Sequence, residues 1–126
     1  MPKTSGSLES DLPPSSPTLS QLILDRVATT PDWPALASPK GDGTWSVMAW
    51  KEAGDEMTTL AAGLLALGGQ PEDRVAIASG TRVEWVLADG AVMLSGGANT
   101  TIYPSTGEDD FAYITNDSEA RFLSAE

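Results

Sequence analysis

The sequence contains neither cysteine nor histidine among its 126 residues. Without cysteine there can be no disulfide bond, no thiolate nucleophile and no thiolate ligand for a metal ion. Without histidine the chain also lacks the commonest general base and metal ligand. No apolar run approaches the roughly 18 residues that a membrane-spanning helix needs. The N-terminus has no charged region followed by an apolar one, as a secretory signal would. We therefore expect a cytoplasmic protein with no transmembrane segment.

Positive charge is also scarce, because 7 lysine and arginine residues face 18 acidic residues, which gives a net charge of −11. Such a surface repels nucleic acid and anionic lipid, so neither is an expected partner. Hydrophobic residues make up 40% of the chain, enough for the core of one modest domain. Residues 1–17 are rich in serine and proline, which predicts a disordered tail ahead of one ordered unit over residues 18–126.

The ordered unit is organised around one predicted strand–helix–strand segment. A short apolar strand, residues 74–79, and a strand rich in threonine and isoleucine, residues 98–103, flank a helix whose apolar side chains recur at helical spacing. Thr81 and Glu84 have the spacing of a capping box at the start of this helix. Gly96-Gly97 fits its end, where the backbone needs positive φ. A segment of this size predicts a right-handed βαβ unit with parallel strands.

Further elements are predicted before this unit. Thr18 has capping-box spacing with Gln21 at the start of a first helix, which Pro31 ends. Residues 35–38 and 44–47 read as the two strands of a β-hairpin. A long helix should follow over residues 50–67, and we expect it on the face of the sheet opposite the central helix.

After the unit, Ser105 or Thr106 is expected to cap a helix that ends near Asn116, and residues 121–125 predict a third parallel strand. The fold class is therefore α/β: an N-terminal helix and β-hairpin followed by a partial parallel βαβαβ sheet. An independent flavodoxin-like binding domain is a weaker alternative, because that architecture has five parallel strands.

Two predicted loops lie at the carboxyl ends of parallel strands, where ligands of open α/β sheets bind. Ser79-Gly80-Thr81 also precedes a helix, whose N-terminus favours anions. Tyr103-Pro104 follows the second strand and could form a binding-site wall. The favoured interpretation of Ser79-Gly80-Thr81 is a plain turn with a helix cap. The favoured interpretation of Tyr103-Pro104 is simple strand termination. Asp89 lies in an otherwise apolar helix, where a structural hydrogen bond is favoured over catalysis.

Other chemically suggestive residues have ordinary explanations. Lys40 lies in a predicted hairpin turn and lacks a phosphate-binding loop around it. The acidic residues 108–110 suit the first turn of a helix, and Asp109 and Asp110 point about 100° apart. The four tryptophans are interpreted as core and hairpin packing: Trp33, Trp45, Trp50 and Trp85. We therefore assign no catalytic, cofactor-binding or metal-binding residue in this chain.

The order of short motifs resembles the AMP-binding, acyl-adenylate-forming enzymes. Residues 28–36 resemble the opening of that family. Residues 61–68 (AAGLLALG) match its LA-x-GL-x-x-LG pattern, and residues 72–77 (EDRVAI) its GDRVAI strand. Residues 102–104 (IYP) are most similar to the long-chain fatty-acid–CoA ligase branch. The resemblance covers residues 18–126, which identifies them as the N-terminal part of an AMP-binding domain that is truncated here.

The resemblance implies ATP-dependent activation of a fatty acid to an acyl-adenylate, followed by transfer of the acyl group to coenzyme A. In the family, the phosphate loop, the glutamate for Mg²⁺ and the catalytic lysine all follow the region seen here. Lys3, Lys40 and Lys51 match none of these positions. We therefore expect the chain alone to be inactive and to bind neither ATP, Mg²⁺ nor coenzyme A. A stand-alone interaction module that pairs with a complementing chain, or a non-functional gene remnant, remain alternatives.

Overall fold

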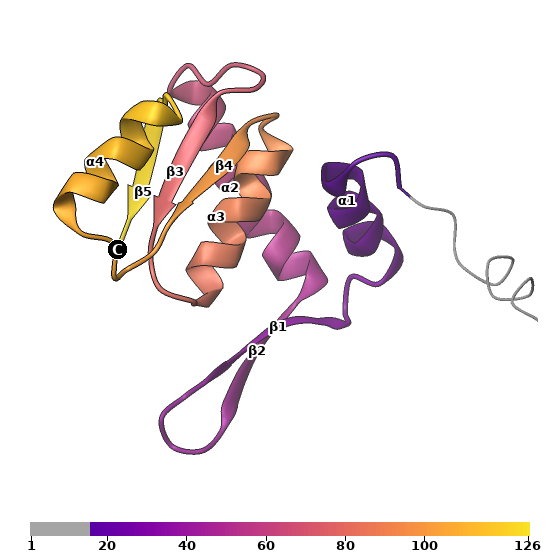
Figure 1. Cartoon of the computed structure of the whole chain (residues 1–126). Helices are drawn as coiled ribbons and strands as arrows, with labels where there is room; N and C mark the ends of the chain where they lie inside the picture. Colours follow the sequence, from indigo (N-terminus) through magenta and orange to yellow (C-terminus); the bar gives the residue numbers. More distant parts are fainter. Residues whose placement is uncertain (1–15) are drawn as a thin grey trace, which may run out of the picture.

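The computed structural model describes residues 16–126. Residues 1–15 of the tail predicted over residues 1–17 lie outside the described residues. No helix in the described part is both long and apolar enough to cross a bilayer. Figure 1 shows the order of the elements along the chain: α1 (Leu19–Thr29), β1 (Pro34–Pro39), β2 (Trp45–Ala49), α2 (Trp50–Ala66), β3 (Arg74–Ala78), α3 (Val83–Leu94), β4 (Ala98–Ile102), α4 (Glu108–Asp117) and β5 (Phe122–Ala125).

The parallel sheet has the strand order β4-β3-β5, so the strand that comes first in sequence lies in the middle. In register, Ala76 of β3 lies between Thr100 of β4 and Leu123 of β5. The prediction of a parallel βαβαβ sheet is therefore confirmed, with strand ends within one residue of those expected. Gly96, just after α3, has the predicted positive φ, at 83°.

Helix α2 lies on the same face of the sheet as α3, so the expectation that it covers the opposite face is wrong. The two helices pack directly against each other, because Gly90 of α3 leaves space for the side chain of Met57. A Cβ atom at Gly90 would lie only 2.5 Å from the Met57 Sδ. Two small cores result, one between the helices around Ala53 and Met57, and one against the sheet around Ile77.

Helix α4 covers the other face of the sheet. The crossover from β3 to β4 and the crossover from β4 to β5 run in opposite directions, so right-handed connections put their helices on opposite faces. In Figure 1, α4 lies next to β5, whereas α2 and α3 lie together beside β3 and β4. Ala76 and Ile102 point away from α3 and are nevertheless buried. The sheet therefore has apolar packing on both faces, as parallel sheets require.

Of the predicted helix caps only Thr18 acts as an N-cap, and its capping box is incomplete because the Gln21 side chain donates to Asp25 instead. The Thr18 hydroxyl accepts a hydrogen bond from the Gln21 N–H at 3.0 Å. Helix α3 instead takes Arg82 as its N-cap, without a side-chain cap, so the capping box of Thr81 and Glu84 is wrong. Helix α4 likewise begins after Gly107, and neither Ser105 nor Thr106 caps it. Its first turn does carry the three acidic residues 108–110, as predicted.

The β-hairpin is confirmed, with β1 and β2 paired antiparallel around the loop that contains Lys40. In Figure 1 it projects away from the rest of the molecule. Leu36 and Met48 point back to the helix core. Trp33 and Trp45 are each 62% exposed, so the interpretation of all four tryptophans as packing residues is wrong for these two.

Candidate functional site

The two loops singled out in the sequence do meet at the carboxyl edge of the sheet. Ser79-Gly80-Thr81 follows β3, and Tyr103-Pro104 follows β4. Together with Trp85 and Val86 of α3 they line a depression of about 490 Å³. Tyr103 is largely exposed there, at 73%. The prediction that both loops share one edge is therefore confirmed.

A carboxylate of the chain itself takes the hydrogen-bond donors at this edge. Glu126, just after β5, accepts hydrogen bonds from the Ser79 hydroxyl and the Gly80 N–H through Oε2, both at 3.2 Å. Its Oε1 accepts from Arg82 Nη1 at 2.9 Å. The hydrogen bond from Gly80, then that from Ser79 and the charge of Arg82, lower the pKa of Glu126. Three donors at this edge are therefore already occupied by a carboxylate of the chain itself.

The positively charged side chains examined for phosphate binding, Arg82 and Lys51, have carboxylate partners within the chain. Arg82 is shared between Glu126 and Glu84, whose carboxylate accepts from Nε at 2.8 Å and from Nη2 at 3.2 Å. Lys51, on α2, is paired with Asp55 at 2.8 Å. Residues 16–126 contain no group of three or more acidic side chains that could hold a metal ion. Arg82 and Lys51 are therefore already paired with carboxylates of the chain itself.

Asp89 has a structural partner, as the favoured interpretation proposed. Asn99 Nδ2 of β4 donates to Asp89 Oδ1 of α3 at 2.8 Å, at a half-buried position. The hydrogen bond ties the central helix to the neighbouring strand. It therefore gives a structural reason for a carboxylate in an otherwise apolar helix.

The Glu126 contact predicts a pH-dependent contribution to stability. The folded pKa lies below the ordinary value of about 4.3. The stabilisation of the fold by the Glu126 carboxylate is therefore present above that pH and is lost as the pH falls through the folded pKa. Glu126→Gln should lower the midpoint of thermal unfolding slightly at pH 7, because exposed ion pairs contribute little. The midpoint should be unchanged at a pH below the folded pKa.

Circular dichroism melts across this pH range test the contribution, with Glu56→Gln, an exposed substitution on α2, as the charge-matched control. An identical pH profile for the two variants would contradict a specific role for Glu126.

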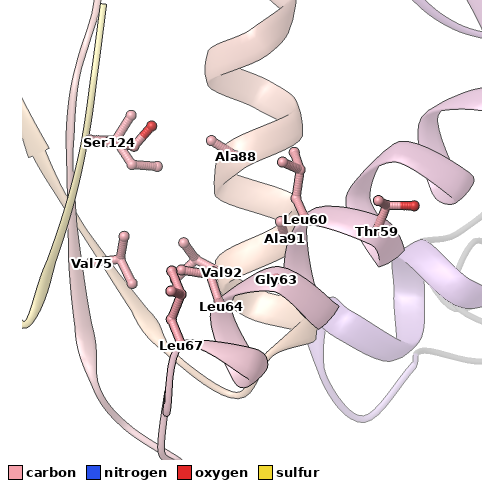
Figure 2. Close-up of a pocket in the computed structure, with 11 residues that line it drawn as sticks. Thr59, Leu60, Gly63, Leu64, Leu67, Val75, Ala88, Ala91, Val92 and Ser124 are labelled. Atoms are coloured by element: carbon pink, nitrogen blue, oxygen red, sulfur yellow. The ribbon is translucent and has the colours of Figure 1, made fainter.

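A second candidate site is an apolar groove of about 290 Å³ on the α2 and α3 face of the sheet. Figure 2 shows the side chains of α2 and α3 facing those of β3 and β5 across it. The lining residues are uncharged, and hydroxyl groups are the only polar side-chain groups among them: Thr59, Leu60, Gly63, Leu64, Leu67, Val75, Ile77, Ala88, Ala91, Val92 and Ser124.

Sequence reasoning did not predict this groove. In the structure Leu60 is 44% exposed and Leu67, one turn beyond Leu64, is 72% exposed. The available signal was the width of the apolar stripe on α2. Leucines at positions 60, 64 and 67 extend this stripe beyond the buried Met57 and Ala61. The partnership of Arg82 and Glu126 was missed as well, because 44 residues separate them.

Comparison with known proteins places the chain in a family. The profile described as AMP-binding enzyme matches residues 23–125. A Mycobacterium bovis protein named long-chain-fatty-acid–CoA ligase FadD15 is 38% identical over 85 residues, which are 68% of this chain and 14% of the relative. A Xenopus laevis long-chain-fatty-acid–CoA ligase is 30% identical over 115 residues, which are 91% of this chain and 15% of that relative. The chain thus spans about a seventh of the length of these relatives.

Solved structures show the same fold. A fatty acyl-adenylate ligase from L. pneumophila matches 86% of this chain with a TM-score of 0.79 and 19% identity, over 19% of its own length. The N-terminal subdomain of Klebsiella oxytoca NpsA matches 85% of this chain with a TM-score of 0.75 and 20% identity, over 27% of its length. The chain belongs to the AMP-binding enzyme family, and its curated relatives place it in the acyl-CoA synthetase branch of that family.

Proposed function

We propose that this chain serves as the first part of the large domain of an ATP-dependent long-chain fatty-acid–CoA ligase. In this role it supplies scaffold: the central strand, its two neighbours and the helices that pack on them. The match to the AMP-binding family over residues 23–125 carries the proposal. The resemblance to ligases that act on long-chain fatty acids supports the substrate class, with ATP, Mg²⁺ and coenzyme A as the reactants of the complete enzyme.

The occupied donors at the carboxyl edge support a scaffold role over a catalytic one. Ser79, Gly80 and Arg82 are the donors best placed for a ligand of an open α/β sheet, and all three bind Glu126. We infer that the groups that bind ATP and transfer the acyl chain belong to other parts of the ligase.

The proposal predicts that the 126-residue chain alone catalyses no ATP–pyrophosphate exchange with palmitate above background. The physical reason is that Ser79, Gly80 and Arg82, at the sheet edge, already donate to Glu126. The full-length Mycobacterium bovis relative, purified in the same way, is the positive control for the assay. Exchange by the purified chain above the no-enzyme rate would contradict the proposal.

A further inference from the structure

Two arginines bridge the amino edge of the sheet, the edge opposite the one at which Glu126 lies. Arg74 begins β3, and Arg121 immediately precedes β5. Arg74 donates from Nε to the Ser118 carbonyl at 2.7 Å and from Nη2 to Glu119 Oε2 at 2.6 Å. Both partners lie in the turn after α4. Arg74 therefore joins the start of the central strand to the end of the helix that precedes β5.

Arg121 makes the reciprocal connection. Its Nη1 donates to the Gly68 carbonyl at 2.9 Å and to Asp73 Oδ2 at 2.7 Å. Gly68 lies in the turn after α2, and Asp73 immediately precedes β3. The carboxylate is itself held in place, because Asp73 Oδ2 also accepts from the Gln70 N–H at 2.7 Å. Each arginine thus joins the start of its own strand to the turn after the helix that precedes the other strand.

The ends of the two helices explain why a cation suits both positions. Neither α2 nor α4 has a basic residue in its last turn. The last carbonyls of a helix lack partners within the helix and carry partial negative charge, which a guanidinium can satisfy. The side chains of Arg74 and Arg121 are 40% and 47% exposed, so water screens part of the attraction to the carboxylates. The charged hydrogen bonds to the helix ends add to what these exposed ion pairs contribute.

The segment that follows β4 depends on such contacts more than the rest of the sheet does. In this chain α4 has no buried residue, and every residue of β5 after Phe122 is exposed. The β3–α3–β4 unit contains most of the sheet core, including Ile77 and Ile102, each 1% exposed. Segments with few buried apolar contacts open at a lower free energy than the core does. The α4–β5 segment is therefore the part of the sheet that local opening should release first.

We propose that Arg74 and Arg121 act together as a clasp that holds the α4–β5 segment on β3. When the arginines lose their partners, this segment separates from β3 while the β3–α3–β4 unit stays folded. Glu126 moves with β5, so the separation also frees the Gly80 N–H at the opposite edge of the sheet. Contacts at the amino edge thus control whether the donors at the carboxyl edge are occupied. The clasp does not depend on the proposed function, since all of its contacts lie within the chain.

Amide hydrogen exchange of the 126-residue chain, followed by NMR, tests the clasp. Arg121→Met should speed exchange by about tenfold at Gly80 and at the β5 amides that bond to β3, because charged hydrogen bonds that oppose opening are lost. The β4 amides that bond to β3 should change by less than about twofold. Equal acceleration at β4 and β5, which complete unfolding of the variant would also produce, would overturn the proposal. Acceleration at β5 without any at Gly80 would overturn the link between the two edges.

Two further variants separate the arginine contacts from net charge. Arg74→Lys keeps the charge but loses the forked contact with the turn after α4, so it should also speed exchange at β5. Lys51→Met removes one positive charge from the pair with Asp55 inside α2, and it should leave β5 exchange within about twofold of the unsubstituted chain. An unchanged β5 in Arg74→Lys, or equal effects of Lys51→Met and Arg121→Met, would show that charge alone is responsible and would overturn the clasp.

Discussion

Replacing Ile77 with alanine is expected to lower the free energy of unfolding by about 3 kcal/mol, within the range of roughly 2–5 kcal/mol for such core truncations. Ile77 is 1% exposed and lies in β3, the central strand. It packs in one cluster with Val75 and Val92. Truncation loses the transfer free energy of the removed methyl and methylene groups and leaves a cavity that strands on both sides prevent from collapsing.

Urea denaturation followed by circular dichroism measures the effect of Ile77→Ala. Leu65→Ala, at an exposed position of α2, is the control and should change the free energy by less than about 0.5 kcal/mol. Because domains are stable by only about 5–15 kcal/mol, the core variant should lose a large share of its stability. A loss at Ile77 no larger than that at Leu65 would show that the sheet core is not organised as described.

The second large effect is expected at the contact between α2 and α3. Gly90→Leu should destabilise the protein by about 1–3 kcal/mol, because overpacking forces shifts in a tightly packed interior. Even the first added carbon would lie 2.5 Å from Met57 Sδ and 2.8 Å from Met57 Cε. The better helix propensity of leucine returns less than about 1 kcal/mol. The clash therefore dominates.

Gly63→Leu is the matched control for this prediction, since Gly63 lies on α2 with no atom within 4 Å of an added Cβ. It should be neutral or slightly stabilising. Met57→Ala in the Gly90→Leu background should recover part of the loss, because it removes the clashing side chain. Similar unfolding midpoints for the Gly63 and Gly90 variants would mean that the helices do not meet at Gly90.

The helices and strands of this chain are predictable because their signals are local. Apolar residues at helical spacing predict α3, and Gly96, with φ of 83°, ends it where a glycine was expected. The strand order is a different matter, since the sequence does not say on which side of β3 the last strand adds. The position of α2 was mispredicted for the same reason, because the contact of Gly90 with Met57 is set by the tertiary structure.

The candidate site shows the same division between local and distant information. The loops after β3 and β4 were placed at one edge correctly, because parallel strands end together. The capping box of Thr81 and Glu84 failed because Arg82, between them, takes the Glu84 carboxylate as its own partner. Glu126 could not be assigned, since its partners lie 44 to 47 residues away in the sequence.

The central place of β3 has a consequence for the nascent chain on the ribosome. One neighbour, β4, follows after a single helix, so the β3–α3–β4 unit can fold as soon as residue 102 has emerged. The other neighbour, β5, begins only at residue 122. At a synthesis rate of about 5–20 residues per second, one edge of an apolar strand stays unpaired for on the order of seconds. An unpaired apolar edge of this kind is a template for pairing between chains, so aggregation during synthesis would begin there.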